Sequence, residues 1–242
     1  MSAEPNLVPR VMSLAVHELR TPVTVVSGYL RMLLRDQAGP LTDKQRKMVE
    51  EADRSCTRIG ALVSEMSELG KLETDMLTLS GPEFNLSSLI TEVASGMHEG
   101  EDRGITLETR GTDRPVMVVG DRPRLAAVLR ALMHAALRER ADSGVIIAEC
   151  STVTESNQAW AIVAIGAEPE LGALADAGRT GKADFDEWRG GLGLALPVGR
   201  RVVEAHGGAL WSAPGNTPRT GSALRLPLGS RVEKDPPAAT KR

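Results

Sequence analysis

The sequence predicts an α+β protein in which an antiparallel helical hairpin precedes an α/β sandwich. Two long N-terminal segments carry apolar residues at steps of three or four, which is the period of an amphipathic helix. After the second segment, shorter helix-like and strand-like patterns are interspersed, which favours one mixed sheet covered by helices. We expect the hairpin at residues 1–78, the sandwich at 79–230 and a polar, disordered tail at 231–242.

The first helical segment runs from Val8 to Leu33 and carries one apolar stripe, which we expect to be buried. The stripe consists of Val8, Val11, Ala15, Leu19, Val23, Val26, Leu30 and Leu33. His17 falls midway between Ala15 and Leu19, so we expect it on the opposite, solvent-facing side. Pro22 lacks a backbone donor and should bend the helix one turn beyond His17.

A second helical segment follows a break at Ala38-Gly39-Pro40, and Thr42 can cap its start. Its stripe consists of Met48, Ala52, Cys56, Ile59, Leu62, Met66, Leu69 and Leu72. Two helices joined by a short loop form an antiparallel hairpin, but stripes of this length leave apolar surface uncovered. A second copy would cover it, so we expect a homodimer with a four-helix bundle.

The linker is expected at Leu79 to Phe84, and the elements of the sandwich follow it. Helices are expected at Asn85–Met97, Asp121–Arg138 and Leu192–Ala205. Strands are expected at Gly104–Arg110, Val116–Val119, Gly144–Glu149, Trp160–Ile165, Ala209–Ser212 and Ser222–Leu228. The stretch from Leu171 to Arg189 has few large apolar residues, which predicts a mobile loop or lid.

The composition narrows the function classes. Hydrophobic residues make up 41% and aromatic residues 2%, so the cores must consist of Leu, Val, Ile, Ala and Met. The net charge of -3 argues against a nucleic-acid partner. We expect no membrane span, no signal peptide and no input domain in this chain. Cys56 and Cys150 fit reduced thiols, so we expect a cytoplasmic protein.

The stretch His17-Glu18-Leu19-Arg20-Thr21-Pro22 concentrates reactive groups near the front of the first helix. A neutral imidazole is a nucleophile near neutral pH, and the adjacent Glu18 can hold or deprotonate its other nitrogen. A lone helical histidine is usually a solvated surface residue. Here the adjacent carboxylate makes His17 a candidate nucleophile.

This stretch, HELRTP on a helical hairpin, resembles the phosphoacceptor box of two-component sensor histidine kinases. Gly190 to Trp211 (GGLGLALPVGRRVVEAHGGALW) is similar to the second glycine box of that family, with its helix and strand. The resemblance covers roughly residues 8–228. It implies a two-layer sandwich of the GHKL ATPase type that uses ATP and Mg²⁺. It also implies that His17 accepts the γ-phosphoryl group and passes it to an aspartate on a response-regulator receiver domain.

The same resemblance implies further roles. Glu18 to Thr21 matches the family's E-x-x-T phosphatase pattern, in which Thr21 positions the water that hydrolyses phosphoaspartate, and Arg20 can steady phosphate charge. The glycine turn would bind the nucleotide at the start of a helix. Its residues are Gly190, Gly191, Leu192, Gly193 and Leu194. Arg138 matches a basic position of the nucleotide site, and His206 is interpreted as structural.

Two departures from the family concern the Asp-led helix. Aligning Asp121 with the start of that helix places Ala131 and Ala135 where the family has two asparagines, the second of which binds Mg²⁺. Alanine cannot ligate a metal, so we expect no metal-binding side chain at these positions. His134 could replace the lost contact with metal or phosphate, although a tolerated helix residue is the simpler interpretation.

A third departure concerns the first glycine box, which in the family provides an aspartate for the adenine amine. The matching stretch, Ile162 to Gly172, contains no aspartate and has lost the glycine spacing. Glu168 and Glu170 could compensate, although solvated loop charges are the simpler interpretation. Arg189 occupies the first position of the G-x-G-L-G-L pattern. Weak ATP binding and poor autophosphorylation are therefore expected.

Three functions remain open at the level of the sequence. The first is a dimeric histidine kinase core that phosphorylates His17 and relays to a response regulator. The second keeps the fold as a histidine phosphotransferase or response-regulator phosphatase with a degenerate ATP site, loaded from elsewhere. The third is a non-catalytic dimeric scaffold. A separate sensor protein is a further candidate partner.

Overall fold

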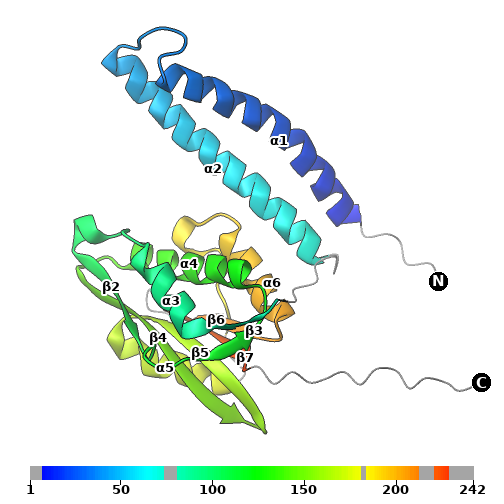
Figure 1. Ribbon diagram of the computed structural model, residues 1–242, viewed down its shortest axis with the longest axis vertical. Coiled ribbons are helices and arrows are strands. Elements are labelled where there is room, and N and C mark those ends of the chain that lie inside the picture. Colours follow the sequence, from blue (N-terminus) through cyan, green and yellow to red (C-terminus); the bar gives the residue numbers. More distant parts are fainter. Residues whose placement is uncertain (1–6, 74–80, 181–183, 213–220, 229–242) are drawn as a thin grey trace, which may run out of the picture.

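The computed structural model describes residues 7–73, 81–180, 184–212 and 221–228. The expected boundary at 78/79, the start of the linker and the tail at 231–242 lie outside these residues. Helices α1 (Leu7–Leu34) and α2 (Asp43–Glu73) form the antiparallel hairpin, which stands on the sandwich with its loop pointing away (Figure 1). None of the described helices is both long and apolar enough to cross a membrane.

The start of α2 is held by reciprocal capping, as expected at Thr42. The Thr42 amide donates to Gln45 Oε1 at 2.9 Å, and the Gln45 amide donates to Thr42 Oγ1 at 3.4 Å. Arg46 joins the loop to α1 because its guanidinium donates to the Leu34 carbonyl and pairs with Asp36. These polar contacts hold the hairpin loop in place, and none of them involves the apolar stripes.

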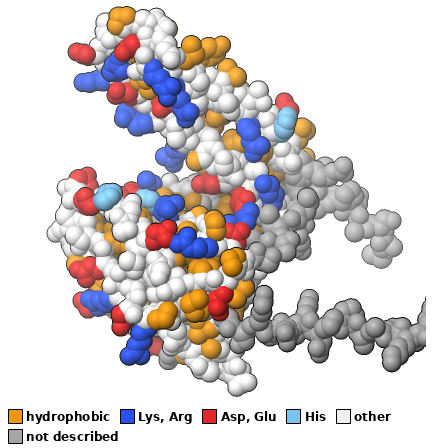
Figure 2. All heavy atoms as spheres, viewed as in Figure 1, with side chains coloured by type: hydrophobic (Ala, Val, Ile, Leu, Met, Phe, Trp, Pro, Cys, Tyr) orange, Lys and Arg blue, Asp and Glu red, His pale blue; other side chains and the backbone are white. Residues whose placement is uncertain are grey.

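The apolar stripe of α1 is only partly buried in the single hairpin, which agrees with the expectation that stripes of this length leave apolar surface uncovered. Val16, outside the expected stripe, is 4% exposed, whereas Val11 and Val26 within it are 55% and 49% exposed. Cys56 and Val63 of α2 are also buried, and Cys56 lies beside Val23 and Ser27 of α1. Other exposed apolar side chains of the hairpin are Leu14, Leu19, Val25, Tyr29, Met32, Met48 and Ile59 (Figure 2). The hairpin thus keeps a large unpaired apolar surface.

The sandwich contains a five-stranded mixed sheet in the order β2-β4-β5-β7-β6, in which only β2 and β4 run parallel. Its strands are β2 (Ile105–Arg110), β4 (Gly144–Glu155), β5 (Gln158–Gly166), β6 (Ala209–Ser212) and β7 (Ser222–Pro227). Three helices cover one face of the sheet, namely α3 (Leu86–Ser95), α4 (Arg122–Glu139) and α6 (Ala195–Ala205). Short 3-10 turns lie at η1 (Glu101–Arg103) and η2 (Arg189–Gly191).

The linker prediction extended too far, because β1 (Glu83–Asn85) already belongs to the sandwich. This strand pairs antiparallel with β3 (Met117–Val119). Asn85 then caps α3 by accepting the Ser87 amide at 3.0 Å. The chain therefore enters the sandwich before Phe84.

The expected loop or lid at Leu171–Arg189 is wrong in its first half. Helix α5 (Glu168–Thr180) packs on the sheet face opposite α4, where Leu171 and Leu174 meet Ile162 and Ala164 of β5. The Trp211 indole donates to the Leu174 carbonyl at 2.7 Å and fixes the helix further. Few apolar residues are enough to hold α5 on the sheet, because Leu174 is fully buried.

The structural interpretation of His206 is confirmed. Its Nε2 accepts the Asp121 amide at 2.9 Å, and its Nδ1 donates to the Val202 carbonyl at 2.7 Å. Asp121 in turn caps α4 by accepting the Arg124 amide at 3.1 Å. His206 thus ties the end of α6 to the start of α4.

A test of α5 follows from its packing. Leu174→Ala should lower the free energy of unfolding by about 2–5 kcal/mol, because a fully buried leucine leaves a cavity. Urea unfolding followed by circular dichroism measures this change. Gly172→Ala in the same helix is the control, since an added Cβ meets nothing within 4 Å and should stabilise slightly. If Leu174→Ala left the free energy of unfolding unchanged, the expectation of a mobile lid would be supported instead.

Candidate functional site

The acceptor stretch lies in the middle of α1 and faces solvent. The side chain of His17 is 77% exposed, and its Nδ1 lies 3.4 Å from Glu18 Oε1. A proton on Nδ1 can therefore be held by the Glu18 carboxylate, which leaves the Nε2 lone pair available for attack. This geometry suits an imidazole that must be reached from outside the molecule.

Thr21 and Arg20 accompany His17 on the exposed part of α1. Thr21 follows His17 by four residues and so lies on the same side of the helix. The helix continues through Pro22, and the Thr24 hydroxyl donates to the Arg20 carbonyl at 2.8 Å. Thr21 is thus placed to act at a group attached to His17 or brought next to it.

The glycine turn leads into α6, which begins at Ala195 rather than at Leu192 as expected. Gly190, Gly191 and Gly193 have φ of 69°, 60° and 65°, a region that favours glycine. Leu192 and Leu194 alternate with them, and Arg138 from α4 joins this turn in lining a cavity of about 190 Å³. The structure therefore brings the nucleotide-site residues expected from the sequence together.

Three side chains of helix α2 contact the glycine turn, namely those of Arg58, Leu62 and Glu65. Glu65 Oε2 accepts the Leu194 amide at 2.9 Å, and the Arg58 guanidinium reaches the Gly191 carbonyl at 3.5 Å. Leu62 Cδ2 lies within 2.5 Å of where a Cβ on Gly193 would be. Burial raises the pKa of the Glu65 carboxyl, and the Leu194 amide opposes this shift. A carboxylate of the hairpin thus binds where a helix start would otherwise offer its amide to an anion.

The two positions that the resemblance assigns to asparagine hold buried alanines. Ala131 and Ala135 are 8% and 0% exposed, and a Cβ on Gly190 would lie 3.2 Å from Ala135. The glycine turn therefore packs closely on α4 at this point. Over the residues that the structure describes, no three His, Cys, Asp or Glu side chains are grouped to hold a metal. The side chains present do not fit the Mg²⁺ that the family implies.

Glu99 is a member of the site that the sequence did not indicate. Its carboxylate accepts from both His134 and Arg138, one turn apart on α4. Burial alone would raise the pKa of Glu99, but the bonds from Arg138 and His134 outweigh it and lower the pKa. His134 is therefore engaged by a carboxylate, which favours the simpler interpretation of this residue. Sequence patterns cannot place Glu99, because the pairing spans 35 residues.

The remaining candidates have structural partners. Glu168 pairs with Arg110 at 2.7 Å, and Glu170 Oε2 accepts the Ala167 amide at 3.3 Å in the first turn of α5. Arg189 is 8% exposed, and its guanidinium donates to the Gly221 carbonyl at 2.8 Å. It also lies 3.8 Å from Glu139 Oε1. Glu168 and Glu170 thus make their contacts at the start of α5, whereas Arg189 is buried at the start of the glycine turn.

Glu99→Gln tests the cluster on α4. A lowered folded-state pKa adds stability that is present above 4.5, the ordinary value, and is lost as pH falls below it. The variant should lose about 1–2 kcal/mol of unfolding free energy near neutral pH, with the difference shrinking below pH 4.5. Urea titrations across that range measure it. Glu101→Gln removes an exposed carboxylate that also contacts a histidine and should change stability little.

Comparison with known proteins agrees with this geometry. Residues 10–75, which include His17, match the His Kinase A (phospho-acceptor) domain. The signal transduction histidine-protein kinase BarA of Escherichia coli is 28% identical over 200 residues, which cover 79% of this chain and 22% of BarA. The sensor histidine kinase GacS of Pseudomonas protegens is 27% identical over 224 residues, which cover 87% of this chain and 24% of GacS.

Solved structures share the fold. Full-length ShkA, in complex with AMPPNP, has a TM-score of 0.66 and 24% identity, covering 92% of this chain and 46% of ShkA. The histidine kinase AdeS of Acinetobacter baumannii has a TM-score of 0.51 and 20% identity, covering 89% and 98%. The chain spans about a quarter of the length of BarA and GacS. Residues 10–75 therefore match the histidine kinase phospho-acceptor domain, and the chain as a whole is similar to two-component sensor histidine kinases.

Proposed function

We propose that this chain is a histidine kinase core, which phosphorylates His17 and transfers the phosphoryl group to an aspartate of a response regulator. The observation that carries the proposal is the exposed His17, with Nδ1 beside Glu18, inside a phospho-acceptor match. The glycine turn and Arg138 support it as the side that receives the nucleotide phosphates. The relatives BarA and GacS, both named as histidine kinases, add to this support.

The chemistry would run through the free ring nitrogen. Nε2 attacks the γ-phosphorus of ATP, and an N–P bond forms while the bond to the bridging oxygen breaks. ADP leaves with that electron pair, and the Nδ1 proton passes to Glu18 or to solvent. A carboxylate oxygen of the regulator would then attack the phosphorus, and the N–P bond would break with its electron pair on the ring nitrogen. A proton returned from Glu18 or solvent would restore the neutral imidazole.

A second function, phosphotransfer or phosphatase activity without an autokinase step, is favoured by the nucleotide side of the site. Buried alanines stand at the asparagine positions, and Glu65 and Leu62 of α2 contact the glycine turn. Both features oppose nucleotide binding in this arrangement, whereas His17 and Thr21 remain exposed. The family role of Thr21, positioning a water for hydrolysis, would then account for turnover.

The hairpin is also proposed to pair with a second copy. Its exposed valines, leucines and methionines form a surface that one partner helix leaves uncovered. Two such hairpins would form a four-helix bundle around that surface. A receiver domain of a response regulator is the proposed acceptor protein, since it carries the aspartate that the relay requires.

Autophosphorylation is tested with γ-labelled ATP and Mg²⁺. The kinase proposal expects label on the intact chain that is stable to base and labile to acid, and His17→Ala should abolish it. His98→Ala is the matched control, because His98 is also exposed and lies beside a carboxylate, Glu101, but outside α1. Label that persists in His17→Ala would contradict the assigned acceptor.

Relay and hydrolysis are tested with a regulator that already carries phosphoaspartate. The second function expects label to appear on His17, or inorganic phosphate to be released, without ATP. Thr21→Ala should slow phosphate release by about 10²-fold or more if Thr21 positions the water, while leaving transfer from His17 measurable. Equal release rates for Thr21→Ala and Thr24→Ala would remove Thr21 from the mechanism.

A further inference from the structure

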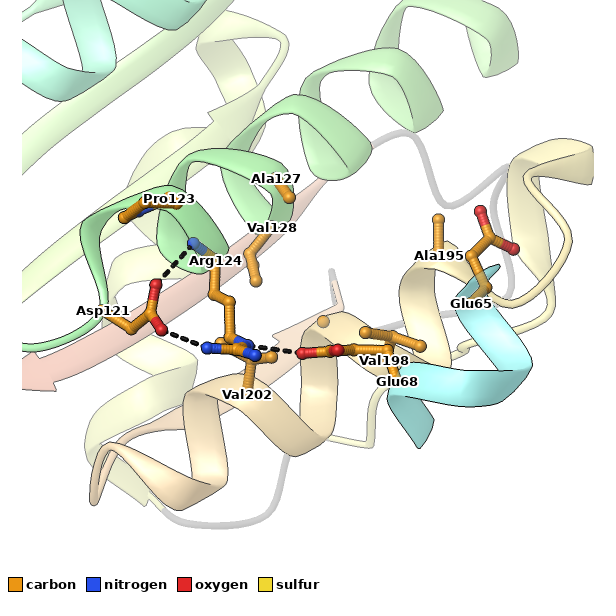
Figure 3. Close-up of a pocket in the computed structure, with 11 residues that line it drawn as sticks. Glu65, Glu68, Asp121, Pro123, Arg124, Ala127, Val128, Ala195, Val198 and Val202 are labelled. Atoms are coloured by element: carbon orange, nitrogen blue, oxygen red, sulfur yellow. Dashed lines mark hydrogen bonds and ion pairs between the residues drawn. The ribbon is translucent and has the colours of Figure 1, made fainter. Parts of the chain in front are cut away.

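A cleft of about 540 Å³ lies between the hairpin and the sandwich. Figure 3 shows that α2 contributes Glu65 and Glu68 on one side, with α4 and α6 on the other. Its volume falls within the range of about 300–1,000 Å³ that is usual for small-molecule sites. The proposed acceptor role of His17 makes no use of this cleft.

The walls of the cleft on the sandwich side are apolar. Ala127 and Val128 of α4 face Val198 and Val202 of α6 across it (Figure 3). Ala127 is exposed and Val198 is half-buried, so these two side chains are open to an occupant, whereas Val128 and Val202 are buried. An apolar group placed here would gain by leaving water.

The rim of the cleft carries an excess of negative charge. The Arg124 guanidinium binds both Glu68 and Asp121 (Figure 3), and burial does not remove the charge of this group because the two carboxylates raise its pKa. Glu65 adds a third carboxylate, one turn before Glu68 on α2. The side chains of Glu68 and Asp121 are only 24% and 18% exposed, so solvent screens their charge incompletely.

Charge and shape together select the occupant. An anion would be repelled by the carboxylates. A bare metal ion is disfavoured because these carboxylates do not meet the geometry of a metal site within the described residues. We infer that the cleft binds a small organic cation with an apolar body, such as an alkylammonium ion. The ammonium group would lie at Glu65 and Glu68, with its hydrocarbon against Ala127 and Val198.

Such a ligand would hold the hairpin on the sandwich. The cleft exists only while α2 is docked, so binding favours the docked arrangement. In that arrangement Glu65 and Leu62 contact the glycine turn. The ligand should therefore oppose nucleotide binding and labelling of His17. This consequence rests on the proposed function, whereas ligand binding itself does not.

The experiment titrates hexylammonium chloride into the full chain by calorimetry, with hexanol and hexanoate as neutral and anionic controls. Saturable one-to-one binding of hexylammonium is expected, with hexanol weaker and hexanoate silent. The backbone amide of Leu194, which donates to Glu65, should shift in an amide NMR spectrum. Absence of saturable binding, or equal binding of hexanoate, overturns the inference.

Variants locate the site. Glu65→Gln combined with Glu68→Gln should weaken hexylammonium binding by about tenfold or more, while Arg124 keeps its bond to Asp121. Glu51→Gln is the matched control on α2, about 25 Å away along the helix, and should leave affinity unchanged. Ala127→Leu fills the cleft from an exposed position and should abolish binding without unfolding the chain. Unchanged affinity in both the double variant and Ala127→Leu overturns the inference.

The two proposals fail separately. If calorimetry shows binding and the variants weaken it, the site is supported even where ATP gives no label on His17. If ATP labels His17 and hexylammonium neither binds nor reduces the label, the kinase proposal stands and the cleft inference is overturned.

Discussion

The burial of α4 against the sheet is the constraint on which both halves of the molecule depend. Leu125, Leu129 and Leu132 on its inner face are at most 1% exposed, so the helix cannot rotate without opening the core. The rest of its surface is thereby fixed. Arg124 meets α2, Ala135 lies under the glycine turn, and the last turns present His134, Arg138 and Glu139 to Glu99 and Arg189.

The contact between α2 and the glycine turn determines which group accepts the backbone amide at the start of α6. One carboxylate, that of Glu65, accepts an amide at the start of α6, and Leu62 packs beside Gly193. The cost of burying Glu65 is visible in its raised pKa. A phosphate group carries more negative charge than a carboxylate and would accept the same Leu194 amide. The hairpin and a nucleotide are thus proposed to compete for one turn, while His17 remains accessible.

Local sequence signals located most elements because each signal matches a local cause. Helical periodicity placed α1, α2 and α4. Thr42 caps α2 as expected, and the glycines of the turn adopt positive φ. The signals failed where burial depends on distant residues. Helix α5 has too few apolar residues for the sequence to predict its burial, yet Leu174 packs on β5 and β7. Val16, which lies outside the expected stripe of α1, is also buried.

The sequence by itself determined that this protein has a helical hairpin that carries His17, a glycine turn, and alanines at positions 131 and 135. These properties follow from residue identity and spacing along one segment. Only the tertiary structure decided that Glu65 occupies the glycine turn and that Glu99 engages His134 and Arg138. Each of these contacts joins residues at least 35 positions apart, and the energy that selects them arises only after the helices have packed.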